Sequence, residues 1–113
     1  MRVLYAEAIY DDSEIDAVIK VLKSQQHSLM TSKNCSTLEK EVANLFGHKY
    51  GVMVNSGSSA NLLALSSLDL DKETEIITPV LTFATTLAPI IQLGFVPNFI
   101  DCGQNTYNID VDL

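Results

Sequence analysis

The chain has 113 residues, of which 47% are hydrophobic and 19% charged, and its formal net charge is -7. This composition is typical of one folded domain and excludes a disordered or fibrous chain. The excess of acidic residues, with Arg2 as the only arginine and the lysines scattered, argues against nucleic acid and against a membrane surface as partners.

A first amphipathic helix is predicted near the N-terminus. Either Asp12 or Ser13 can cap it, because both residue types accept hydrogen bonds from the first free N–H groups of a helix. Its apolar residues recur at the spacing of one helical face: Ile15, Val18, Ile19 and Leu22. Such a face needs a core to pack against.

A second helix is predicted after the polar stretch 25–34. Ser36 and Glu39 have the spacing of a capping box, and Gly47 is a typical helix stop. Four apolar residues share one face of this helix: Leu38, Val42, Leu45 and Phe46. Residues 1–48 are therefore expected to form two leading helices.

The segment Tyr50–Asn55 reads as a strand, and Ser58–Leu68, apolar nearly all round, reads as a helix buried against a sheet. The turn between them centres on Gly57. The first N–H groups of such a helix have no intrahelical partner, and the helix dipole adds partial positive charge there. This turn is therefore predicted to bind a phosphate group.

The remainder alternates in the same way. Glu75–Thr78 is expected to be a strand, Thr82–Leu93 a helix broken or kinked near Pro89, and Phe95–Asp101 a strand. The stretch 76–100 has no charged residue, but three prolines interrupt it, so it is read as buried strand, helix and strand rather than as a membrane span. Residues 49–113 thus predict an α/β fold, a parallel-sheet β-α-β-α-β segment.

Ligands of parallel sheets bind beyond the carboxyl ends of the strands. These ends are 55–58, 78–83 and the residues from Asp101 onward. Phe83 follows the second strand, where its ring could lie flat on a planar cofactor whose phosphate is held at Ser58 and Ser59. The alternative is that the two serines are ordinary helix caps and that Phe83 is a core aromatic residue.

Other site chemistries lack their motifs. There is no dinucleotide-binding fingerprint or P-loop, and His27 and His48 have no neighbouring metal ligands. Cys35 and Cys102 stand alone and are expected to be reduced packing residues. No secretory signal is visible in MRVLYAEAIYDD, so a cytoplasmic location is expected.

Two long segments carry a family resemblance. KYGVMVNSGSSANLLAL, followed by ITPVLTFATTLAPIIQLGFVPNFIDCGQNTYNID, resembles the DegT/DnrJ/StrS family of pyridoxal-phosphate-dependent nucleotide-sugar aminotransferases. The earlier segment LMTSKNCSTLEKEVANLFG resembles a leading helix of that family. The motifs look closest to the branch of sugar 3-dehydrases, which use the same cofactor to remove a hydroxyl group.

The resemblance implies the N-terminal part of a fold type I aminotransferase large domain. It implies pyridoxal phosphate or pyridoxamine phosphate as cofactor, bound by Gly57, Ser58 and Ser59 at the phosphate and by Phe83 at the ring. It further implies a nucleotide-linked 4-keto-6-deoxy sugar as substrate, an amino donor such as glutamate, and a homodimer in the full-length form. Surface polysaccharide or deoxysugar biosynthesis is the expected setting.

The chain departs from the family in length. The lysine that bonds the cofactor, a histidine in the dehydrases, and the aspartate that pairs with the pyridinium nitrogen have no match here. Without them the chain alone is not expected to turn over substrate. Besides aminotransferase and 3-dehydrase, a non-catalytic phosphate-binding α/β module and a purely structural remnant remain open alternatives.

Overall fold

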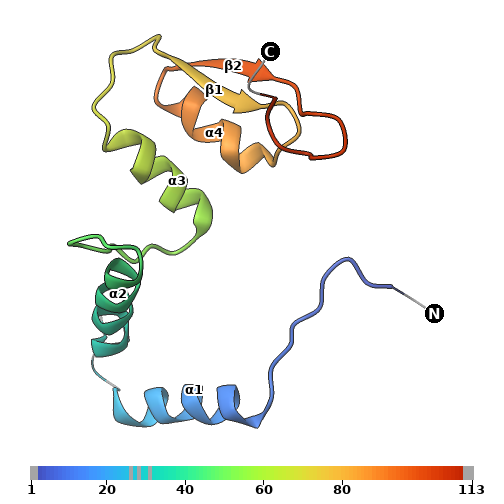
Figure 1. The fold of residues 1–113 in the computed structure, drawn as a ribbon. Coiled ribbons are helices and arrows are strands. Elements are labelled where there is room, and N and C mark those ends of the chain that lie inside the picture. Colours follow the sequence, from blue (N-terminus) through green and yellow to red (C-terminus); the bar gives the residue numbers. More distant parts are fainter. Residues whose placement is uncertain (1–2, 26, 28, 31, 111–113) are drawn as a thin grey trace. The chain divides into compact units, whose positions relative to one another are not determined.

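The computed structural model describes residues 3–25, 27, 29–30 and 32–110. The elements in chain order are α1 (Asp12–Ser24), α2 (Lys33–Leu45), α3 (Gly57–Ser66), β1 (Glu75–Pro79), α4 (Ala84–Gln92) and β2 (Val96–Ile100) (Figure 1). The chain forms two compact units, which meet in the sequence between Met53 and Val54.

Helix α1 is capped by Asp11 rather than by either predicted residue. The Asp11 carboxylate accepts a hydrogen bond from the Ser13 backbone N–H at 2.8 Å, and the Glu14 carboxylate accepts one from the Asp11 N–H at 2.8 Å. The predicted cap at Asp12 or Ser13 is wrong because both residues already lie in the first turn. Only the reciprocal pair Asp11–Glu14 has capping-box geometry here.

The predicted capping box of α2 is also wrong, because the helix starts earlier. Its N-cap is Ser32, and Ser36 lies inside the helix with its hydroxyl donating to the Lys33 carbonyl at 3.1 Å. The Glu39 carboxylate instead accepts a hydrogen bond from the Met53 backbone N–H at 2.8 Å. The stop at Gly47 is confirmed, since this residue adopts φ +69° and its N–H donates to the Asn44 carbonyl.

The predicted strand at Tyr50–Asn55 is not formed. Residues 51–54 have no regular secondary structure, and no described strand pairs with them. A strand is stabilised by the ladder of hydrogen bonds to its neighbour, so an apolar run without a neighbour stays irregular.

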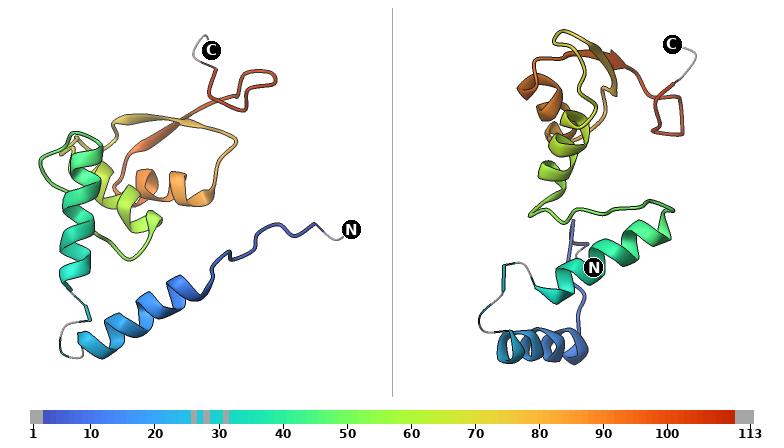
Figure 2. Two further views of the ribbon diagram at one scale, coloured as in Figure 1. Left: turned by 60° about the horizontal axis from the view of Figure 1, so that its bottom comes forward. Right: turned by 90° about the vertical axis from the view of Figure 1, so that its left-hand side faces the viewer.

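The second unit confirms the predicted parallel α/β arrangement. Strands β1 and β2 pair in parallel, with a register that runs from Glu75 opposite Val96 to Pro79 opposite Ile100. Helix α4 connects them, and α3 lies beside α4 (Figure 2). Pro89 lies inside α4, where the chain continues in helical form and the Leu93 N–H donates to the Pro89 carbonyl at 3.0 Å.

The core of this unit is small. Thr78, Ile90 and Phe95 are buried, whereas α3, which was expected to be buried against the sheet, contains no buried residue. Leu63 on α3 is 52% exposed. Two strands cover too little of the helix surface to bury a helix that is apolar on all sides.

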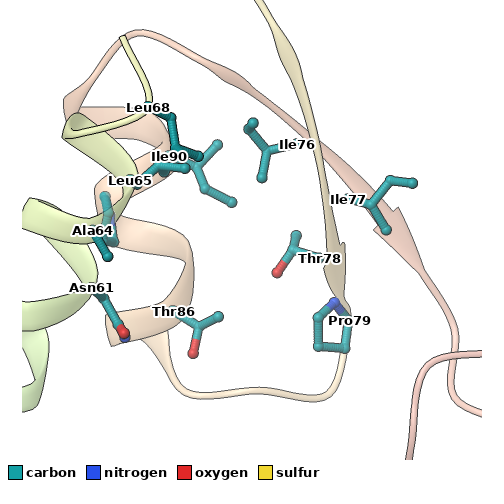
Figure 3. Close-up of a pocket in the computed structure, with 11 residues that line it drawn as sticks. Asn61, Ala64, Leu65, Leu68, Ile76, Ile77, Thr78, Pro79, Thr86 and Ile90 are labelled. Atoms are coloured by element: carbon teal, nitrogen blue, oxygen red, sulfur yellow. The ribbon is translucent and has the colours of Figure 1, made fainter. Parts of the chain in front are cut away.

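A mostly apolar pocket of about 450 Å³ therefore remains between α3, β1 and α4 (Figure 3). Its lining includes Leu65 from α3, Leu68 from the turn after that helix, Ile76 from β1 and Ile90 from α4. Among the described residues, no helix is long and apolar enough to cross a membrane.

Candidate functional site

The candidate site begins at the N-terminus of α3. Ser56 is the N-cap, with extended backbone angles of φ -161° and ψ 160°, and its side-chain oxygen accepts a hydrogen bond from the Ser59 N–H at 3.2 Å. Its carbonyl accepts the first intrahelical bond, from the Ala60 N–H at 3.0 Å. The reading of Ser58 and Ser59 as helix caps is wrong, because both lie inside α3. Serine just before a helix is a capping signal, and it points to Ser56 here.

Capping by Ser56 leaves two donors free. In the part of the chain that the structure describes, the backbone N–H groups of Gly57 and Ser58 have no acceptor. The Ser58 hydroxyl group has no hydrogen-bond partner among the described residues either. The first N–H groups of a helix point along its axis, and the dipole makes them attractive to an anion. This turn therefore has the donors that a phosphate group needs.

The position of Gly57 is not crowded. A Cβ atom placed on it would meet nothing within 4 Å. Gly57 does not adopt a positive φ, and the backbone conformation does not itself require glycine there. A small side chain at this position would therefore meet no neighbour.

The N-terminus of α4 lies close to that of α3. The two helices run side by side in the same direction (Figures 1 and 2). Their first turns share a pocket of about 220 Å³, lined by Ser58, Ser59, Leu62, Thr85, Ala88, Pro89 and Gln92. None of these lining residues ionises, so the attraction of the pocket for an anion rests on N–H and hydroxyl dipoles.

Phe83 occupies the N-cap position of α4, two residues before Thr85 in that pocket. Its side chain is 71% exposed, so the reading as a core aromatic residue is wrong. An exposed ring is available to stack on a planar group. Thr85 carries no recognisable signal in the sequence, because hydroxyl residues in the first turn of a helix are common and have no distinctive spacing.

The strand ends meet as expected for a parallel sheet. Pro79 and Ile100 are opposite each other at the ends of β1 and β2, and the Val80 N–H donates to the Ile100 carbonyl at 3.0 Å. The loop from Val80 to Phe83 thus leaves the sheet at its carboxyl edge. Fold and geometry together are those of an α/β protein with an open helix N-terminus at α3 and an exposed aromatic ring at the start of α4.

Comparison with known proteins defines the family. Residues 8–113 match the sequence model of the DegT/DnrJ/EryC1/StrS aminotransferase family. The chain belongs to this family.

Three relatives illustrate its range. The chain is 34% identical to GDP-4-keto-6-deoxy-D-mannose 3-dehydratase of Yersinia pseudotuberculosis, over 95% of this chain and 28% of the relative. The solved Escherichia coli enzyme of that activity, with bound hydrated pyridoxal phosphate, superposes with a TM-score of 0.83 at 38% identity, over 95% of this chain and 28% of that one. The chain is also 34% identical to dTDP-3-amino-3,4,6-trideoxy-alpha-D-glucose transaminase of Micromonospora megalomicea, over 88% of this chain and 26% of that relative.

The chain spans less than a third of the length of these relatives. The similarity therefore covers the elements of the candidate site described above, but not the rest of the relatives' sequence.

Proposed function

We propose that the turn Ser56–Ser59 binds the phosphate group of pyridoxal phosphate or pyridoxamine phosphate. The observation that carries this proposal is the pair of N–H groups at Gly57 and Ser58, at the N-terminus of α3, that have no acceptor in the described part of the chain. The Ser58 hydroxyl adds a third donor, and hydrogen bonds to an ionised phosphate are the stronger kind. The bound cofactor in the related Escherichia coli structure supports the choice of ligand.

Phe83 is proposed to lie against the pyridine ring of the same cofactor. Its exposed ring at the start of α4 supports this role, as does the pocket that joins the first turns of α3 and α4. A ligand held at its phosphate by α3 and at its ring by Phe83 is fixed in position and orientation.

Bound pyridoxal phosphate supplies an electron sink for bond breaking next to a carbonyl-derived carbon. The residues of this chain contribute binding and orientation: N–H and hydroxyl groups hold the phosphate, and the aromatic ring limits tilting of the cofactor. The residues that move protons and bond the cofactor have no match among the lysines of this chain. The activity is therefore proposed for the whole protein that carries this chain.

The reaction proposed first is removal of the C3 hydroxyl from a nucleotide-linked 4-keto-6-deoxy sugar. It is supported by the two 3-dehydratases, which are 34% and 38% identical to this chain over 95% of its length. Aminotransfer to a nucleotide-linked keto sugar is the second candidate, supported by the related transaminase. Glutamate as amino donor and a homodimeric assembly are proposed for both reactions.

Product analysis distinguishes the two reactions. The whole protein is incubated with pyridoxal phosphate, glutamate and a GDP- or dTDP-linked 4-keto-6-deoxy sugar, and the sugar product is identified by mass spectrometry and NMR. A sugar that has lost its C3 oxygen supports dehydration, and a sugar that carries a new amino group supports aminotransfer. If neither product forms, and phosphate does not perturb the amides of Gly57 and Ser58, the proposed function is wrong.

A further inference from the structure

The ring of Phe83 depends on the backbone for its position. Its side chain is 71% exposed, so neighbouring side chains cover little of it. The residue lies where the loop 80–83 ends and α4 begins, with backbone angles of φ -71° and ψ 147°. Stacking needs a ring at a defined separation and tilt from its partner. The contacts that fix this stretch of backbone therefore decide how well Phe83 can stack.

Thr86, in the first turn of α4, holds the chain on both sides of Phe83. Its backbone N–H donates to the Phe83 carbonyl at 2.9 Å. Its side-chain oxygen accepts a hydrogen bond from the Thr82 hydroxyl at 3.0 Å. The first bond fixes the peptide group that follows Phe83, and the second fixes the residue that precedes it. Thr82, Phe83 and Thr86 are called here the Thr86 bracket.

The hydroxyl bond lies in a helix turn that has no side-chain cap. Phe83 is the N-cap of α4 and makes no side-chain hydrogen bond to the helix, because a phenyl ring has no acceptor for the first N–H groups. The first turn of α4 thus lacks the kind of bond that Ser56 supplies to α3. The bond between Thr82 and Thr86 ties this turn to the residue before it instead.

The other end of the loop is anchored to the sheet. The Val80 N–H donates to the Ile100 carbonyl at 3.0 Å, next to the paired ends of β1 and β2. Only Leu81 lies between Val80 and the Thr86 bracket. A loop anchored at both ends has fewer conformations, and restricting them before a ligand binds lowers the entropy cost of binding.

We propose that Thr86 is a positioning residue for the cofactor: through its bond to Thr82 it holds the Phe83 ring in the orientation that stacks on the pyridine ring. This inference rests on the proposed function, because it assigns Thr86 a role in that same site. Thr86 itself does not touch the ligand. It lines the apolar pocket between α3, β1 and α4 (Figure 3), whereas Ser58 lines the smaller pocket at the first turns of the two helices.

A ligand without a ring separates positioning from a general loss of structure. Inorganic phosphate can use the N–H groups of Gly57 and Ser58, but it offers nothing on which Phe83 can stack. A positioning role therefore predicts a weaker affinity for pyridoxal phosphate alone, whereas a damaged fold lowers both affinities. A second signature is coupling, because loss of the Phe83 ring should make the bond between Thr82 and Thr86 irrelevant to binding.

The test uses four substitutions in the whole protein. Thr86→Val removes the acceptor hydroxyl and keeps the branched shape, Thr82→Val removes the donor of the same bond, and Thr86→Ser keeps the hydroxyl. Thr74→Val is the matched control, because it removes a threonine hydroxyl bond, to the Asp71 carbonyl at 2.6 Å, before β1 begins. Calorimetry measures the affinities for pyridoxal phosphate and for inorganic phosphate. Hydrogen exchange at the Thr86 amide reports the bracket itself.

We expect Thr86→Val and Thr82→Val each to weaken pyridoxal phosphate about threefold, the effect of losing one neutral hydrogen bond. Inorganic phosphate should bind both variants as it binds the parent. Thr86→Ser and Thr74→Val should leave both affinities unchanged. In the Phe83→Ala background, Thr86→Val should cause no further loss. If Thr86→Val loses its fold by circular dichroism, Thr82→Val, at an exposed loop position, carries the test.

Three outcomes overturn the inference in different ways. If Phe83→Ala weakens pyridoxal phosphate but neither valine variant does, positioning by Thr86 is wrong and the proposed function stands. If the valine variants weaken both ligands equally, the bond supports only the fold of α4, and the positioning role is again wrong. If the parent protein binds neither ligand, the proposed function fails, and the positioning role fails with it.

Discussion

The side-chain oxygen of Ser56 lies 3.2 Å from the backbone nitrogen of Ser59 and accepts its hydrogen bond. This bond pairs the Ser59 N–H at the start of α3, whereas the N–H groups of Gly57 and Ser58 have no acceptor among the described residues. The cap and the proposed phosphate site thus share a single helix turn, and the two roles can be separated by substitution.

Ser58→Ala combined with Ser59→Ala is expected to weaken phosphate binding by about 2 to 3 kcal/mol if two hydrogen bonds to the ionised phosphate are lost. Isothermal calorimetry with pyridoxal phosphate and with inorganic phosphate measures the change. Ser66→Ala, at the other end of α3, is the matched control and should bind like the parent. Equal affinity in the double variant would show that the two hydroxyl groups do not bind phosphate and that only backbone N–H groups remain as donors.

Ser56→Ala is expected to destabilise the protein by about 1 kcal/mol, because the Ser59 N–H loses its acceptor. Ser56→Asn should restore most of this loss, since asparagine is an equally good cap. Denaturant unfolding followed by circular dichroism gives both values. A stability in Ser56→Ala equal to that of the parent would mean that the cap bond contributes nothing to α3.

Phe83→Ala is expected to lower the affinity for pyridoxal phosphate by about 0.5 to 1.5 kcal/mol, the usual contribution of ring stacking. The affinity for inorganic phosphate should not change, because that ligand has no ring. Since the side chain is 71% exposed, the free energy of unfolding should change by less than about 0.5 kcal/mol. An equal loss for both ligands would indicate that Phe83 acts through the fold of α4 instead.

Acidification is expected to melt the start of α1. Hydrogen bonds from the Ser13 side chain and backbone lower the pKa of the Asp11 carboxyl, and the Asp11 backbone N–H lowers the pKa of the Glu14 carboxyl. A carboxyl with a lowered folded-state pKa stabilises the fold fully above its unfolded value, here 3.8 and 4.5, and loses that contribution as the pH falls through the folded value.

Amide chemical shifts of Ser13 and Glu14 between pH 6 and about pH 2 follow this transition. Asp11→Ala should remove most of the acid dependence in the first turn of α1, whereas Asp16→Asn, farther along the helix, should leave it in place. If acid leaves the first turn of α1 unchanged in the parent protein, the capping box of Asp11 and Glu14 does not stabilise that helix.

Local sequence patterns predicted most of the helices and the parallel pair. The periodic apolar residues of α1 and α2, the stop at Gly47 and the alternation from β1 through α4 to β2 all appear in the structure. Each depends on contacts within a turn or between neighbouring elements. The phosphate-site turn was likewise placed correctly between an apolar run and a helix, although its role in binding remains a prediction.

The errors share a physical origin. The run at Tyr50–Asn55 has the composition of a strand, but composition cannot supply a neighbour, and the described chain offers none. Ser36 and Glu39 have capping-box spacing, but whether a helix has already begun depends on the residues before it.

The sequence by itself determined the fold class, the family and the position of the turn that begins α3, since these depend on local periodicity and on motifs. Only the tertiary structure showed that Ser56 caps that turn, that Phe83 is exposed, and that Glu39 binds Met53. The contact between Glu39 and Met53 joins residues fourteen apart. Which distant donor a carboxylate meets is decided by packing of the backbone, and no spacing rule within one helix encodes it.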